Sequence, residues 1–420
     1  MLTCSAILAI MASMSGSYEE TNALLYRLLD THPQLSAAET ARASEAAALR
    51  ATQRRRLPSV ALTVGAGTTE ETVRIDGLDG ALTDSREPVG GRLTVSQPLF
   101  TSGVIGGAIG AAKARLGKAD LTLDATRQDL LFAGAEAMAT IVRDRTVLEA
   151  RLRNEDVLAQ RLEESWARQD VGLATVTDVQ QSRSRSAQAT ANRVAAEGAL
   201  AVSEARFERI FGFPAPASLQ MPVLPEALPE SLDDAIGTAL EISPDYARAG
   251  EEVKAARATL RARRGQLLPQ LALTAEAAYQ DDQRLGLQVA EAESYSIMVE
   301  GRWDIFDGGA GYARAAAAQQ DVGTAMFQED DSRRALQEQV AAAFHRHRVA
   351  TASLLARRAQ RDAASSAAEG VAEEYLEGRR TRLDVLDADR ELSDAEVAVI
   401  AAEAEEVTAG FALLRAMGAL

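Results

Sequence analysis

Hydrophobic positions along the chain follow two periods, and each period predicts one kind of element. In residues 297–305 the side chains alternate, with Ile297 and Val299 on one face and Glu300 on the other. Alternation of this kind predicts strands of about ten residues with one apolar face. The same alternation occurs at 60–64, 92–99 and 270–279.

These segments predict two strand hairpins, one at about 59–100 and one at about 269–306, with loops near 68–88 and 280–294. Such strands either pack an apolar face on a soluble core or turn that face to lipid. Four strands are too few to close a barrel, since about eight are needed even to enclose packed side chains. We therefore expect several copies of the chain to close the sheet together.

The remaining long segments have a helical period and lack the strongest helix breaker. No proline lies between Pro98 and Pro214, and none follows Pro269. Apolar residues there step by three and four, as in Leu131, Ala135 and Met138, which is the spacing of helices that meet along a seam. The predicted helices are 34–56, 103–170, 174–211, 244–266, 309–376 and 380–417.

Two glycines interrupt the long helices and predict tight turns. Gly172 is followed by Thr175 and Asp178, and Gly378 stands 206 positions later with Thr381 and Asp384 at the same spacing. Glycine adopts the left-handed conformation that ends a helix, and threonine or aspartate caps the next one. Each pair of helices therefore forms a hairpin.

This correspondence extends along the chain and indicates a duplicated half. Leu57-Pro58 recurs as Leu268-Pro269, and Phe211-Gly212 recurs as Met417-Gly418. The repeat is too long for a solenoid unit. We divide the chain into a first repeat at 17–211, a proline-rich linker at 212–243 with a capped helix start at Ser231, and a second repeat at 244–420.

Composition narrows the function classes. Aromatic residues make up 4% of the 420 residues and the net charge is −16, so binding to nucleic acid through general basicity is not expected. Cys4 is the only cysteine, which excludes an intrachain disulfide. His345 and His347 are two positions apart and point to different sides of a helix, so no metal site is expected. No catalytic set of Ser, His, Asp or Cys recurs, and we expect neither an enzyme nor a cofactor.

The N-terminus has two interpretations. Leu2 to Met14 is mostly small and apolar, like the core of a secretory signal, but no Lys or Arg precedes it. We interpret 1–16 as the remnant of a signal peptide, and the alternative is the opening of a helix.

The two hairpin turns, together with Gln97-Pro98-Leu99-Phe100 at the join of strand and helix, resemble the TolC family of bacterial outer-membrane channels. The resemblance covers about 20–420. It implies a mainly α fold with a β-barrel portion that a homotrimer closes from 12 strands in the outer membrane. It also implies a helical tunnel in the periplasm, an equatorial belt at 212–243, and export of proteins or small molecules with a periplasmic adaptor and an ABC or proton-driven inner-membrane pump.

The resemblance also implies roles for residues at the hairpin turns. Asp384 and Asp387 match a pore constriction and share one helix face, which would favour cations in a narrow lumen. Helix capping and surface charge are the alternative roles of these aspartates. The residues that match a gate latch, through an Arg–Asp pair and a Tyr–Thr hydrogen bond, are Thr177, Asp178, Tyr375 and Arg380. Arg379 and Arg382 lie close enough to replace Arg380 in that pair.

The leading function is thus a passive export duct. The competing function is a periplasmic coiled-coil adaptor or scaffold that never enters the membrane. The alternating strands with charges on their polar face favour the duct. The residues do not identify the cargo, the pump, the adaptor or a lipid anchor.

Overall fold

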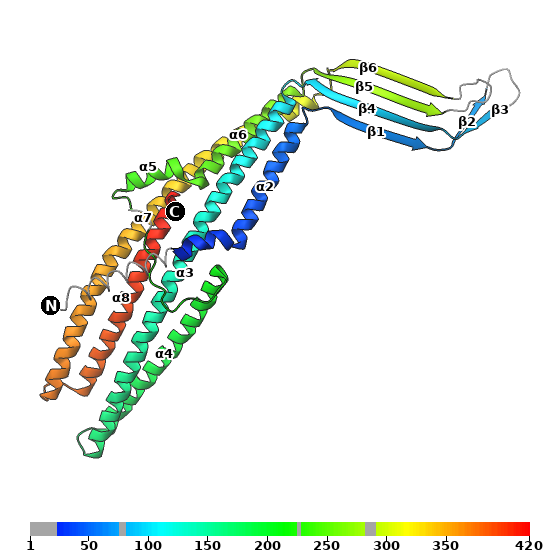
Figure 1. Ribbon diagram of the computed structural model, residues 1–420. Coiled ribbons are helices and arrows are strands. Elements are labelled where there is room, and N and C mark those ends of the chain that lie inside the picture. Colours follow the sequence, from blue (N-terminus) through cyan, green and yellow to red (C-terminus); the bar gives the residue numbers. More distant parts are fainter. Residues whose placement is uncertain (1–22, 75–80, 225–227, 282–290) are drawn as a thin grey trace, which may run out of the picture. The chain divides into compact units, whose positions relative to one another are not determined.

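The computed structural model describes residues 23–74, 81–224, 228–281 and 291–420 (Figure 1). The segment 1–16, interpreted above as a signal remnant, lies outside these residues. The described residues form two compact units, one of 23–40, 121–247 and 331–420 and the other of 41–120 and 248–330, with the gaps given above.

The sheet in the second unit has four antiparallel strands in the order β1-β4-β5-β6. Their bounds are β1 Ser59–Ala66, β4 Val89–Phe100, β5 Gln270–Asp281 and β6 Ala292–Arg302. The two predicted hairpins are therefore confirmed, and β4 joins them by pairing with β5, with Val95 opposite Ala275. Trp303 and Ile305, whose positions continued the alternation, lie beyond the end of β6.

The sequence predicted a loop at 68–88, and this prediction is wrong. The described residues of this segment contain a second hairpin, β2 Thr69–Arg74 and β3 Ala81–Arg86, in which Thr72 is opposite Thr83. Most positions of these two segments are polar in the sequence, so they lack the alternation of hydrophobic and polar positions that identified the other strands.

Register places the apolar side chains of the four-stranded sheet on one face. Leu62 is paired with Leu93, and Ala275 with Ile297, and paired residues of an antiparallel sheet point to the same side. This face is exposed: Leu62 is 70% and Ile297 77% accessible. The opposite face carries polar residues, among them an ion pair between Arg92 and Glu276.

The helices follow the predicted ranges within two residues at each end. The long pair α3 Val104–Asp170 and α7 Ala310–Leu376 have 67 residues each, and their partners α4 Val176–Phe211 and α8 Arg382–Met417 have 36 each. Two further helices, α2 Pro33–Arg54 and α6 Pro244–Gly265, precede the strand hairpins. None of the helices in the described residues has both the length and the apolar content that a membrane crossing needs.

The first unit contains two apolar cores. One is built around Met138 and the stacked rings of Phe207 and Phe211, whose centroids are 4.2 Å apart. The other is made where α5 Leu232–Ile242 packs on α7 and α8 through Ala235 and Val340. Helix α5 lies in the proline-rich linker and begins at the predicted cap, Ser231.

Candidate functional site

The two hairpin turns at the ends of α3 and α7 have the same local construction. Gly172 and Gly378 both have φ of +76°, a conformation that only glycine adopts without strain. Three residues later Thr175 and Thr381 cap α4 and α8. The turns and their caps are therefore confirmed as the glycine and threonine spacing predicted.

Each cap is a reciprocal capping box. The backbone N–H and the hydroxyl of Thr381 donate to the same oxygen of Asp384 at 2.8 Å, and the Asp384 N–H donates back to the Thr381 hydroxyl at 3.3 Å. Thr175 and Asp178 repeat these bonds at α4. Asp178 and Asp384 thus have a capping role, whatever other role they have at the turn.

The caps lower the pKa of both carboxyl groups. For Asp384 the main cause is the hydrogen bond from the Thr381 backbone N–H, followed by that from its hydroxyl, and the charge of Arg380 adds a smaller effect. For Asp178 the corresponding bonds from Thr175 lower the pKa in the same order. Hydrogen bonds to the ionised form favour it, and a helix N-terminus favours negative charge.

A lowered pKa in the folded chain makes the stability of the turn depend on pH. Asp384 stabilises the folded turn above the ordinary carboxyl pKa near 3.8, and that contribution is lost as pH falls through the lower folded value. We expect Asp384→Asn to lower the apparent Tm at neutral pH, and the difference from wild type to shrink below about pH 4. The measurement is the Tm of both proteins across pH.

The control for this prediction is Asp362→Asn, which removes an exposed carboxylate in the middle of α7 that pairs with its neighbour Arg361. A Tm difference for Asp384→Asn that stays constant through pH 3 would contradict the capping explanation.

Asp387 lies one turn after Asp384 on α8, and the structure gives it a partner from α4. Its carboxylate accepts a hydrogen bond from Arg185 at 2.6 Å, and its side chain is 55% exposed. The two aspartates predicted for a pore constriction therefore share one end of α8, and each has a cation nearby.

The predicted latch residues are gathered at the same turns but have other partners within this chain. Arg380 pairs with Glu374 at 2.7 Å rather than with an aspartate, although its charge acts on Asp384. Tyr375 lies under two guanidinium groups, those of Arg168 at 5.2 Å and Arg382 at 5.7 Å, rather than in a hydrogen bond with Thr177. Thr177 is exposed in the first turn of α4.

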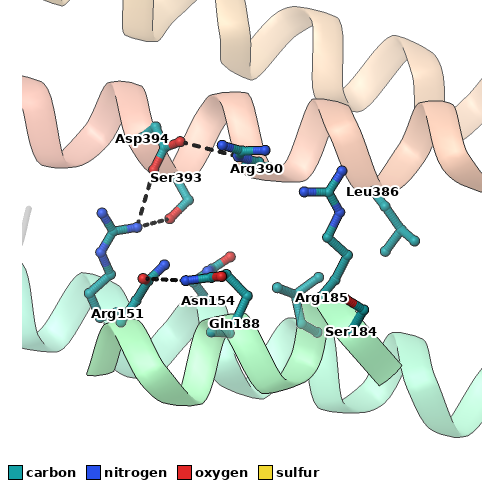
Figure 2. A pocket seen from close by; sticks show the side chains of 12 residues that line it. Arg151, Asn154, Ser184, Arg185, Gln188, Leu386, Arg390, Ser393 and Asp394 are labelled. Atoms are coloured by element: carbon teal, nitrogen blue, oxygen red, sulfur yellow. Dashed lines mark hydrogen bonds and ion pairs between the residues drawn. The ribbon is translucent and has the colours of Figure 1, made fainter. Parts of the chain in front are cut away.

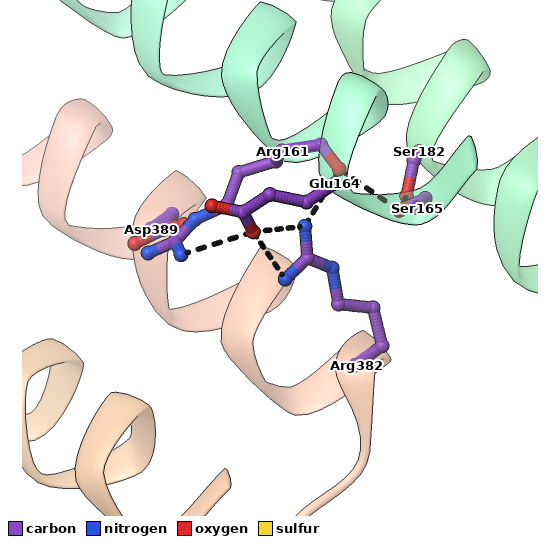
Figure 3. A network of polar contacts seen from close by, with 6 residues as sticks. All are labelled: Arg161, Glu164, Ser165, Ser182, Arg382 and Asp389. Atoms are coloured by element: carbon purple, nitrogen blue, oxygen red, sulfur yellow. Dashed lines mark hydrogen bonds and ion pairs between the residues drawn. The ribbon is translucent and has the colours of Figure 1, made fainter. Parts of the chain in front are cut away.

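A cluster that the sequence did not predict links α3 to α8 beside the turns (Figure 3). The guanidinium of Arg382 donates to the Arg161 carbonyl at 2.7 Å and to Glu164 at 3.2 Å, and its side chain is only 9% exposed. Arg161 reaches Asp389 at 3.4 Å, which adds a second link between the same helices. We call these four residues the α3–α8 clasp.

The clasp was missed because its bonded partners, one on α3 and one on α8, are more than 200 positions apart in the sequence. The sequence indicated for Arg382 only that it could replace Arg380 in a pair with an aspartate. The one available signal was a pair of charges, Arg161 and Glu164, at helical spacing, but most such pairs lie on solvated helix faces. Next to the clasp the hydroxyls of Ser165 and Ser182 are buried and bond each other at 2.8 Å across α3 and α4.

The described residues contain no group of three or more His, Cys, Asp or Glu side chains arranged to hold a metal ion. What the turns offer is a set of fixed carboxylates and guanidinium groups at the free ends of two helical hairpins. Fixed charges of this kind attract ions of the opposite sign.

Comparison with protein families gives one match over most of the chain. The family described as outer membrane efflux protein matches residues 24–212 and 235–419. Among curated relatives, the outer membrane efflux protein BepC of Brucella suis biovar 1 is 31% identical over 291 residues, 69% of this chain and 63% of BepC. The outer membrane protein TolC of Escherichia coli is 24% identical over 289 residues, 66% of this chain and 59% of TolC. The matched stretch thus spans less than two thirds of either relative.

Solved structures agree on the fold. The outer-membrane channel OprN superposes with a TM-score of 0.81 at 22% identity, covering 96% of this chain and 91% of OprN. At that identity the likeness concerns the fold alone. It matches the mainly helical chain with four antiparallel strands described above.

Proposed function

Because this chain belongs to the outer membrane efflux protein family, a family of channel proteins of the bacterial outer membrane that extend into the periplasm, we propose that it is the exit duct of an export system. In this proposal the chain acts as a homotrimer, is gated at its periplasmic hairpin turns, and passes proteins or small molecules to the outside. The family assignment leaves the alternative of an adaptor outside the membrane without support.

The four-stranded sheet carries the proposal. Its apolar face is most exposed on the edge strands, where Val64 and Tyr295 are 74% and 78% accessible. These edge strands, β1 and β6, have no second neighbour among the described residues. Unpaired strand edges and an apolar face of this size do not persist in water. Contact with lipid would cover the apolar face, and pairing with strands of other copies of the chain would cover the two edges.

Three copies would supply 12 strands, enough for a closed barrel with the polar face inward. The pair of Arg92 and Glu276 would then face the lumen, where water keeps two charges solvated. Alternation of an apolar outer face and a polar inner face is what a membrane barrel requires. The helical hairpins would continue the duct into the periplasm.

The proposed partners meet the duct at the hairpin turns. We propose that the ends of the hairpins at Gly172 and Gly378 meet a periplasmic adaptor, which couples the duct to an ABC or proton-driven pump. The proposed division places the two repeats at 17–211 and 244–420 and an equatorial belt at 212–243. The duct itself performs no reaction.

In the proposed gate, Asp384 and Asp387 of three chains form the constriction. Thr177, Asp178, Tyr375 and Arg380 serve as the latch, with bonds to neighbouring chains that replace or add to those within one chain. The pairing of Arg380 with Glu374 and its effect on Asp384 support a charged link that can rearrange at the turn.

Single-channel conductance of the purified protein in a planar bilayer, under a salt gradient, tests the duct. The expected result is small, discrete and cation-selective steps. Protein that is folded, inserted and trimeric but gives no steps, even with the hairpin turns removed to open the duct, would overturn the proposal.

The constriction makes a separate prediction. Replacing Asp384 and Asp387 with asparagine removes six carboxylates from a trimer, and we expect the cation-to-anion permeability ratio to fall by about two- to tenfold. The reversal potential under a salt gradient measures this ratio. A matched control is Glu373→Gln with Glu377→Gln, which removes the same charge from the last turn of α7 and the residue that follows the helix. If the control changes the ratio as much as the aspartate variant does, the constriction lies elsewhere.

A further inference from the structure

A groove between three helices of the first unit is lined by cationic and amide side chains (Figure 2). It has a volume of about 400 Å³ and lies between the α3–α4 hairpin and α8. Arg151 comes from α3, Arg185 from α4 and Arg390 from α8. All three helices therefore contribute a guanidinium group to one concave surface.

Charge in the groove has the opposite sign to the charge of the chain. The protein carries a net charge of −16, and Arg185 is already paired with Asp387 at 2.6 Å beside the groove. The groove lining nevertheless has three arginines and one carboxylate, Asp394. That carboxylate is shared, at 3.4 Å from Arg151 and 3.6 Å from Arg390. Both distances exceed those of a strong charge-assisted hydrogen bond, so these guanidinium groups retain capacity for a further acceptor.

The remaining lining residues suit an organic anion. Asn154, Gln188 and Ser184 add hydrogen-bonding groups around the arginines. Beneath them Leu158 and Leu386 are buried against one another and Ala189, which gives the groove an apolar floor. An apolar base with a few convergent polar groups is the usual make-up of a site for a small molecule.

We propose that this groove binds a small organic or inorganic polyanion with at least two oxyanion groups, of the carboxylate or phosphate class. One oxyanion group lies between Arg151 and Arg390, and the other is bound by Arg185. Guanidinium groups recognise both classes of oxyanion because their paired N–H groups match two oxygens at once.

Binding would connect the two hairpins of one chain. Arg151 and Arg185 belong to the first hairpin, and Arg390 belongs to the second. An anion held by all three adds links between helices that already meet through Arg185 and Asp387. A ligand that binds only the joined arrangement stabilises it by mass action. The anion is therefore expected to hold the hairpins together.

Isothermal titration calorimetry of the detergent-solubilised protein tests the site without requiring a conducting channel. Pyrophosphate and citrate, titrated separately at constant ionic strength, represent the phosphate and carboxylate classes. We expect at least one of them to bind saturably with one site per chain. Arg185→Gln should weaken that binding by about tenfold or more, because a charge-assisted hydrogen bond is lost.

Arg183→Gln is the matched control, since it makes the same change two residues away on α4 at an exposed position outside the groove lining. It should bind as tightly as wild type. The proposal is overturned if neither anion binds saturably to the folded protein, or if the two variants lose affinity equally. It is also overturned if Arg185→Gln dissociates the trimer while anion binding is absent, because the groove would then be a contact between chains. The duct function would survive each of these results.

Discussion

Replacing Arg382 with methionine should loosen the hairpin turns and increase the open probability of the channel. The substitution keeps an unbranched side chain over Tyr375 but removes the bonds to Glu164 and to the Arg161 carbonyl. Breaking a fully buried ion pair costs about 3–5 kcal/mol. Glu164 is 52% exposed, so solvent recovers part of its charge and we expect a loss of about 1–3 kcal/mol.

The effect on gating follows from where the lost bonds lie. The α3–α8 clasp joins the two hairpins next to their turns. Removing it therefore destabilises the state in which the hairpins are held together. Each 1.4 kcal/mol lost from that state changes an equilibrium about tenfold. We therefore expect open probability to rise by roughly tenfold in planar bilayers, and the apparent Tm of the first unit to fall.

Arg379→Met is the matched control for the clasp. It removes the same charge three residues earlier, from a side chain that is 72% exposed and pairs with nearby Glu377. Exposed pairs of this kind contribute about 0–1 kcal/mol. Equal open probabilities in the two variants would show that net charge at the turn, and not the clasp, controls opening.

Adding one methyl group at Gly107 should destabilise the second unit, whereas the same change at its neighbour Gly106 should not. A Cβ at Gly107 would lie 2.6 Å from the backbone nitrogen of Ala262 and 2.7 Å from the carbonyl oxygen of Ala258. Backbone atoms cannot move aside as a flexible side chain can, so α3 and α6 must separate. Overpacking of this kind costs about 1–3 kcal/mol.

Gly106 has no neighbouring atom within 4 Å of the same position, so alanine there meets open space. Its expected effect is a gain of about 0.5–1 kcal/mol, because alanine loses less backbone entropy than glycine in a helix. The apparent Tm of Gly107→Ala should thus be lower than that of Gly106→Ala by roughly 2–10 °C. Equal values would mean that α3 and α6 do not approach as closely as the structure describes.

Local patterns predicted the helices and the four strands of the main sheet within a few residues. The glycine and threonine spacing likewise predicted both turns and both caps, and Asp384 is the residue at which the capping alternative is confirmed. Its proposed place in a pore constriction stays a prediction, as does that of Asp387. The hairpin β2–β3 was not predicted because its mostly polar sequence lacks an alternation of hydrophobic and polar positions.

The partners of the charged residues could not be predicted in this way. Arg380, Arg379 and Arg382 lie within four positions, and spacing alone gave no reason to choose among them. The structure separates them by burial: Arg382 is enclosed between α8 and α3, whereas Arg379 and Arg380 remain near solvent and pair with glutamates of the same turn.

By itself the sequence determined the elements, the turns and the helix caps, because these depend on residues within about four positions of one another. Only the tertiary structure decided that β4 pairs with β5, that Arg382 bonds α3, and that three arginines share one groove. In each of these contacts at least two of the chain segments are more than 150 positions apart. Their proximity comes from the packing of whole helices and strands, in which the burial of apolar surface sets the position and charged side chains pair with whatever that packing brings within reach.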